Sequence, residues 1–212
     1  VVSHNTTQLG VVRTVWELGR DPNLTFLIIS NTAGMSEKII RPIKDMIVSN
    51  ARVHRVFPHL RPGTKWTDSA INVARPVERK DYSVQGVGVG GNVLGSRIDR
   101  IVFDDILDFE NTLTKNMREQ VIEWIKSTPM SRLTPDSRVI AIGNAWHRED
   151  AMHWMASIEG WEFRKFPLLD PQTGECNWPA RFTPERIAEI RARTGPREFG
   201  RMFLCEPRDD AE

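Results

Sequence analysis

The sequence alternates short apolar runs with longer amphipathic segments, and this alternation is the feature that most constrains the fold. Short runs of β-forming apolar residues predict buried strands, whereas apolar residues at helical spacing predict helices packed on a core. The predicted strands span residues 24–30, 66–74, 84–89, 101–103 and 138–142. The predicted helices span residues 6–18, 35–49, 114–127 and 183–193, with a kink or a later start expected at Pro42. Such alternation predicts an α/β fold, a mostly parallel sheet with helices on both faces.

Composition narrows the class of protein. With 40% hydrophobic and 27% charged residues among 212, the chain is typical of a globular domain. The formal net charge is only +1, so DNA would have to be contacted by a local patch or by a ring of subunits. No apolar run approaches the length of a membrane span, so no membrane partner is expected. Cys176 and Cys205 form neither a disulfide framework nor a repeated metal motif, which fits a reducing cytosol.

Paired carboxylates follow the strand predicted at residues 101–103. In P-loop ATPases an apolar strand ends in acids that hold Mg²⁺ beside the nucleotide phosphates, and ligands of open α/β sheets bind at the carboxyl ends of strands. Asp104 could therefore hold a metal-bound water, and Asp105 could orient or deprotonate the attacking water. Acids that simply end a strand in solvent are an equally good interpretation of this pattern alone.

Two weaker signals accompany this pair. Asn144 follows the strand at residues 138–142, one crossover after Asp105, so the two strand ends are expected side by side; the amide could bond the attacking water or serve as a turn residue. Residues 3–7 stand before a helix, where backbone N–H groups could bind phosphate. This predicted phosphate segment comprises Ser3, His4, Asn5, Thr6 and Thr7, of which Thr6 or Thr7 could reach Mg²⁺. It lacks the glycines and lysine of a standard phosphate loop, so a simple helix cap is the alternative.

Two other patterns favour structural interpretations. Residues 86–91 satisfy G-x-G-x-x-G, but no helix of sufficient length follows, so we predict that these glycines shape a turn near the site. His147, Asp150 and His153 have helical spacing without a converging ligand set, which favours a capped helix start with solvated charges over a metal site.

Taken together, the residues resemble phage large terminase subunits. The order and spacing of four pieces carry this resemblance over roughly the whole chain: Gly95–Asp105, Ile142–Asp150, Trp178–Arg186 and Gly195–Pro207. The resemblance implies a P-loop NTPase fold of the ASCE/RecA-like type, with ATP and Mg²⁺ as cofactors. It further implies a homo-oligomeric ring that moves double-stranded DNA into the procapsid at the portal vertex, in the host cytoplasm, with the portal protein and small terminase as partners.

The resemblance also implies roles for individual residues. Asp104 resembles the Mg²⁺-binding Walker B acid and Asp105 the acid that activates water. Asn144 resembles the residue that couples hydrolysis to movement, and Arg97 lies where an arginine finger is found in this family. The alternative without a catalytic role is that Arg97 is a surface arginine that pairs with Asp99.

The sequence departs from the family pattern at both ends. No Walker A lysine occurs in residues 3–7. The first residues, from Val1, resemble the end of a strand, so we expect the natural N-terminus to lie upstream. Residues 1–207 are expected to form the ATPase domain and residues 208–212 to begin a linker, so no nuclease activity is expected. A helicase-type ATPase and a catalytically silent docking fragment are the alternative functions.

Overall fold

The computed structural model describes residues 6–77, 79–94 and 97–207, and these form two compact units. Of the described residues, one unit contains those from 6 to 106 and from 123 to 143, and the other contains those from 107 to 122 and from 144 to 207. Each unit is described by itself below.

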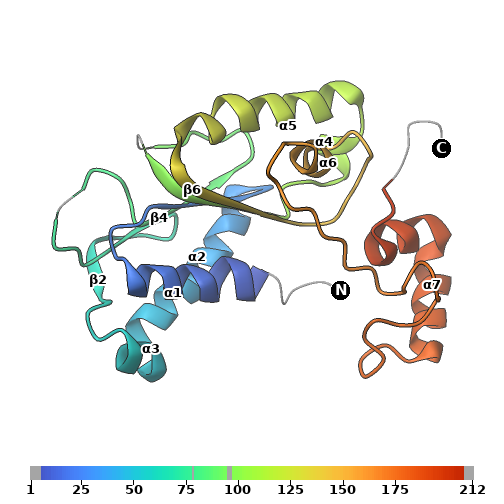
Figure 1. Cartoon of the computed structure of the whole chain (residues 1–212), viewed down its shortest axis with the longest axis horizontal. Coiled ribbons are helices and arrows are strands. Elements are labelled where there is room, and N and C mark those ends of the chain that lie inside the picture. Colours follow the sequence, from blue (N-terminus) through green and yellow to red (C-terminus); the bar gives the residue numbers. More distant parts are fainter. Residues whose placement is uncertain (1–5, 78, 95–96, 208–212) are drawn as a thin grey trace. The chain divides into compact units, whose positions relative to one another are not determined.

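The first unit is built on a six-stranded sheet (Figure 1). Its strands, in chain order, are β1 (Phe26–Ser30), β2 (Pro62–Trp66), β3 (Ala70–Val73), β4 (Val84–Gly88), β5 (Ile98–Asp104) and β6 (Leu133–Ile142). The spatial order is β2-β3-β4-β1-β5-β6; the last four strands are parallel to one another, and β3 is antiparallel to both of its neighbours. The prediction of a mixed α/β fold with a mostly parallel sheet is therefore confirmed.

One predicted strand was wrong. Residues 66–74 form no single strand, because the chain turns between Trp66 at the end of β2 and Ala70 at the start of β3. The hydroxyl of Thr67 bonds both the backbone carbonyl and the backbone N–H of Ala70, and this closes the turn. Local side-chain hydrogen bonding of this kind competes with extended structure and is invisible to an apolar pattern.

Helices cover one face of the sheet. They are η1 (Thr6–Val12), α1 (Arg13–Arg20), α2 (Ala33–Ser49) and α3 (Ala51–Val56); the short η2 (Met130–Arg132) precedes β6. Thr32 caps α2 by accepting a hydrogen bond from the N–H of Met35, so this helix begins before the predicted position and continues through Pro42. A later start at Pro42 is therefore wrong. A hydroxyl cap satisfies one of the backbone N–H groups that every helix start leaves unpaired.

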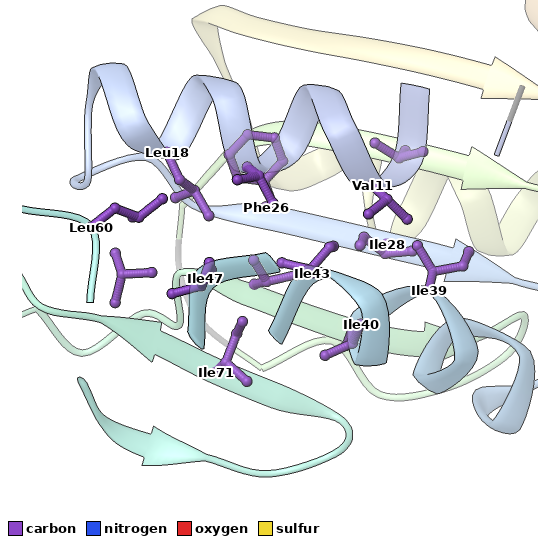
Figure 2. Packing of buried hydrophobic residues seen from close by; sticks show 14 residues of the cluster. Val11, Leu18, Phe26, Ile28, Ile39, Ile40, Ile43, Ile47, Leu60 and Ile71 are labelled. Atoms are coloured by element: carbon purple, nitrogen blue, oxygen red, sulfur yellow. The ribbon is translucent and has the colours of Figure 1, made fainter. Parts of the chain in front are cut away.

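The core of the first unit lies between α2 and the sheet (Figure 2). Ile40, Ile43 and Ile47 of α2 are fully buried, and Ile28 of β1 and Leu18 of α1 meet them there. Their recurrence at intervals of three and four residues is the helical spacing that the sequence showed. Side chains on the opposite face of the central strands are buried too: Leu27 and Ile29 of β1, Ile101 and Phe103 of β5. Burial on both faces explains why these strands read as continuous apolar runs.

The glycines of residues 86–91 have two structural functions. Gly86 and Gly88 lie in β4, where a Cβ atom would stand 2.8 Å from the Ser36 hydroxyl and 2.7 Å from the backbone nitrogen of Ala33, respectively. They let α2 approach the sheet closely. Gly90 has a φ of 78° and forms the turn that follows. The prediction that all these glycines shape a turn is correct for the end of the segment and wrong for its strand part.

Helices are the main regular elements of the second unit. It contains α4 (Phe109–Thr112), the first part of α5 (Lys115–Ser127), α6 (Ala151–Ala156), α7 (Pro184–Phe199) and η3 (Gly200–Leu204). Thr183 caps α7 as predicted, and Gly195, with a φ of 76°, interrupts the helix where its end was predicted. Across the described ranges, no helix has the length and apolarity needed to cross a membrane.

Candidate active site

Backbone hydrogen bonds join the carboxyl ends of four parallel strands. The N–H of Val89, after β4, donates to the carbonyl of Ser30 in β1 over 3.0 Å. The N–H of Asn31 donates to the carbonyl of Asp105 over 3.2 Å, and the N–H of Asp105 donates to the carbonyl of Ile142 over 2.9 Å. Asp104 and Asp105 therefore lie at the edge where open α/β sheets bind ligands, as the sequence predicts.

The start of η1 lies against this edge. The Thr6 hydroxyl donates a 2.7 Å hydrogen bond to Oδ1 of Asp104, across 98 positions of sequence. The structure thus brings together two residues that the sequence nominated separately, one for the phosphate segment and one for the metal acid. Thr7 beside it is exposed, and Ser3, His4 and Asn5 lie outside the described residues.

Asp104 is a buried carboxyl whose ionised form is disfavoured by its surroundings. It is 5% exposed, and burial raises its pKa to about 6; the Thr6 bond lowers this pKa and the nearby charge of Asp105 raises it. Burial also raises the pKa of Asp105. A buried carboxylate without a compensating positive charge is more basic than usual and attracts a cation.

Asp105 has a strained backbone. Its φ of 47° lies in the left-handed region, which costs a residue other than glycine about 1 kcal/mol or more. The two backbone hydrogen bonds to Asn31 and Ile142 hold it there. Gly143 faces it, and a Cβ atom on that glycine would stand 3.4 Å from Oδ1 of Asp105. The surrounding strands therefore fix the direction in which the second carboxylate leaves the sheet.

The strand preceding Asn144 lies where the crossover argument predicts. β6 pairs with β5 in parallel, with Ile142 opposite Asp104. Asn144 is the second residue after β6 and belongs to the other compact unit. The adjacency of the strand ends is confirmed, and the role of the amide remains a prediction.

Arg97 does not lie near Asp104 within one subunit. It is exposed and precedes Ile98, the first residue of β5, whereas Asp104 is the last residue of that strand. At a rise of roughly 3.3 Å per residue, about 20 Å separates the two ends. Within its own subunit Arg97 therefore lies at the opposite end of β5 from Asp104, and its role as an arginine finger stays a prediction. Asp99 instead accepts hydrogen bonds from the N–H and hydroxyl of Thr25.

The segment around His147 is a helix cap, as predicted, but its charges are not all solvated. Asp150 is fully buried and caps α6 by accepting from the N–H of His153. It also accepts from the N–H groups of Trp146 and His147, which offset the cost of burial. Within the described part of the chain, no three His, Cys, Asp or Glu side chains gather to hold a metal ion.

Removing the charge of Asp104 is expected to stabilise the fold. The pKa of this carboxyl is about 6 in the folded protein against 3.8 for an ordinary aspartate, so its ionised form destabilises the folded state at neutral pH. This penalty disappears as the pH falls through 6 toward 4. Asp104→Asn should therefore raise the free energy of unfolding by about 3 kcal/mol at neutral pH and by little near pH 4. Urea unfolding without metal measures this, and the exposed Asp136→Asn is the control. A loss of stability at neutral pH would contradict the prediction.

Comparison with known proteins adds an independent finding. No protein-family model matches the chain. A large terminase subunit of Enterobacteria phage T3 is 28% identical over 232 aligned residues, which cover 93% of this chain. The chain spans only 38% of the length of that relative. The resemblance drawn from the motifs is confirmed: the chain is similar over most of its length to a phage large terminase subunit.

Proposed function

We propose that the chain is the ATP-hydrolysing motor domain of a viral large terminase, which moves double-stranded DNA into the procapsid. The observation that carries the proposal is the hydrogen bond between Thr6 and Asp104 at the carboxyl edge of a parallel sheet. A helix-start hydroxyl beside a strand-end carboxylate is the Mg²⁺-binding pair of P-loop NTPases. The relationship to the phage T3 protein supports the same assignment.

The available oxygen atoms fit Mg²⁺ and ATP. The carboxylate of Asp104 and the hydroxyl of Thr6 are hard oxygen donors, the kind that Mg²⁺ prefers, and a bound cation would offset the buried charge of Asp104. Mg²⁺ would neutralise charge that develops on the phosphates. Asp105 would orient and deprotonate the attacking water, and Asn144 would couple hydrolysis to the movement of the motor. The proposed ring would act at the portal vertex, with the portal protein and the small terminase as partners.

One observation favours a second candidate, a catalytically silent docking fragment. The first lysine of the chain is Lys38, so no lysine stands near Thr6 in sequence to hold the phosphates. Buried Asp104 and half-buried Asp105 oppose this candidate, because a docking fragment would gain nothing from the cost of desolvating two carboxylates.

Two substitutions of Thr6 test the proposal. Thr6→Val keeps the shape and removes the hydroxyl, so Mg²⁺-dependent ATP binding should weaken about tenfold, as expected for one lost polar ligand. Thr6→Ser keeps the hydroxyl and should bind ATP with Mg²⁺ nearly as tightly as the unchanged protein does. Calorimetric titration with ATP, with Mg²⁺ and with EDTA, measures the difference. ATP binding is the readout because we expect the isolated chain to turn over ATP poorly. Equal binding by both variants, or no binding by the unchanged chain and a chain extended upstream, would favour the docking fragment.

A further inference from the structure

An acid-free segment follows the middle of α2. Residues 46–66 contain Arg52, Arg55, Arg61 and Lys65 and no aspartate or glutamate. This segment therefore carries a formal charge of +4 in a chain whose total is +1, so the remaining residues carry −3. The nearly neutral total conceals this concentration, which is why overall charge gave no candidate for a DNA-contacting surface.

The four basic side chains are displayed on the surface. All four are exposed, and none forms an ion pair with any part of the chain that the structure describes. Arg52 and Arg55 are three residues apart on α3 and so share one side of that helix. Arg61 immediately precedes β2 and Lys65 lies within it, where the pairing of β2 with β3 shifts register. We name these four residues the basic surface.

The backbone beneath the basic surface is firmly held. The side chain of Asn50 caps α3 by accepting from the N–H groups of Arg52 and Val53. The ring of His54 bonds the carbonyl of Ile47 in α2 over 2.7 Å. Leu60 is fully buried in the core. Exposed charges on a rigid backbone lose little conformational entropy of the main chain when they bind a partner.

The basic surface is remote from the ATP site. The ring of His59 bonds the carbonyl of Gly19 over 2.8 Å, at the far end of the helix whose first residue, Thr6, bonds Asp104. The thirteen helical steps from Thr6 to Gly19 correspond to about 20 Å. The basic surface is therefore too far from this site to hold the nucleotide phosphates of its own subunit.

We infer that the basic surface binds the phosphate backbone of double-stranded DNA. The inference rests on the proposed function, since a motor that accepts any sequence needs phosphate contacts rather than contacts to base edges. Four unpaired cations on a fixed surface meet this requirement, and each phosphate that they neutralise releases counterions. β2 is an edge strand, and charges on edge strands also oppose unwanted association. An experiment separates these two functions.

The test compares two quadruple variants that reach the same net charge. Arg52, Arg55, Arg61 and Lys65 are changed to Gln in the first; Lys115, Lys126, Lys165 and Arg193, which are also exposed, are changed to Gln in the control. Both lower the formal net charge from +1 to −3. Fluorescence anisotropy with a labelled duplex of about 30 base pairs, without nucleotide or Mg²⁺, gives the affinity across a range of salt concentrations. Circular dichroism and sedimentation check folding and association.

The first variant should lose about thirtyfold or more in affinity at low salt, and the slope of log affinity against log salt should become shallower by about 3. The control variant should keep the DNA affinity and the salt dependence of the unchanged protein within experimental error. A third variant with Arg52, Arg55 and Arg61 changed to Lys should retain the slope, because phosphate contacts require charge rather than the guanidinium shape. Unrelated duplexes should compete equally.

Three outcomes would overturn the inference. They are equal weakening in both quadruple variants, no duplex binding by the unchanged chain at low salt, and self-association of the first variant with unaltered DNA affinity. The last would assign the charges to edge protection. Because no nucleotide is present, failure of the ATPase proposal leaves these DNA results unchanged, and the Thr6 titration separates the two.

Discussion

Asp105→Asn is expected to lower ATP turnover of the assembled protein by about a hundredfold or more while nucleotide binding stays nearly intact. The reason is that an amide cannot accept the proton of the attacking water. Burial raises the pKa of Asp105, which makes this carboxylate a stronger base than a solvated one. Asparagine tolerates the left-handed backbone at this position, where φ is 47°, so the fold should survive the change.

Asp104→Ala supplies the contrasting result. This substitution removes the oxygen that accepts from Thr6 and the charge that would hold Mg²⁺, so Mg²⁺-dependent binding itself should fall by at least about tenfold. Steady-state hydrolysis and nucleotide titration of the same samples separate the two roles. Asp136→Asn, an exposed acid of β6 at the register shift in its pairing with β5, is the matched control. Equal and small effects of both substitutions would mean that these carboxylates are merely strand ends.

Arg97→Ala is expected to lower turnover of the assembled ring by about a thousandfold, because an arginine finger neutralises charge on the transferred phosphoryl group. Since Arg97 and Asp104 stand at opposite ends of β5, the arginine can only serve the site of a neighbouring subunit. Turnover should therefore depend on assembly, and the isolated subunit should be insensitive to the substitution. Hydrolysis measured over a range of protein concentrations checks both statements.

Mixed rings test the direction of this contribution. A site that combines an Arg97→Ala subunit with an Asp105→Asn neighbour keeps one intact aspartate and one intact arginine. Mixing the two inactive proteins should therefore restore part of the turnover. Arg138→Gln, which changes an exposed arginine of β6, is the control. Full activity of a ring made only of Arg97→Ala subunits would exclude the finger.

Local patterns in the sequence determined the elements and part of the site. The apolar runs of β1 and β5 are buried on both faces, the isoleucines of α2 recur at helical spacing, and Thr183 caps α7 where predicted. Each of these depends on neighbours within a few residues, so a sequence displays it directly. The position of Asp104 and Asp105 at a carboxyl edge follows from the same local fact, because they end a parallel strand.

Only the tertiary structure decided which distant groups meet and how burial shifts the pKa of each ionisable group. The Thr6 hydroxyl reaches Asp104 across 98 positions, and the raised pKa of Asp104 follows from burial that no local pattern encodes. The direction of β5 places Arg97 and Asp104 at opposite ends of one strand. The basic surface was present in the composition of residues 46–66, but the fold alone separated it from the ATP site and left its charges unpaired. Charge and burial act through space, whereas the strand and helix patterns act along the chain, and this physical difference divides what could be predicted from what could not.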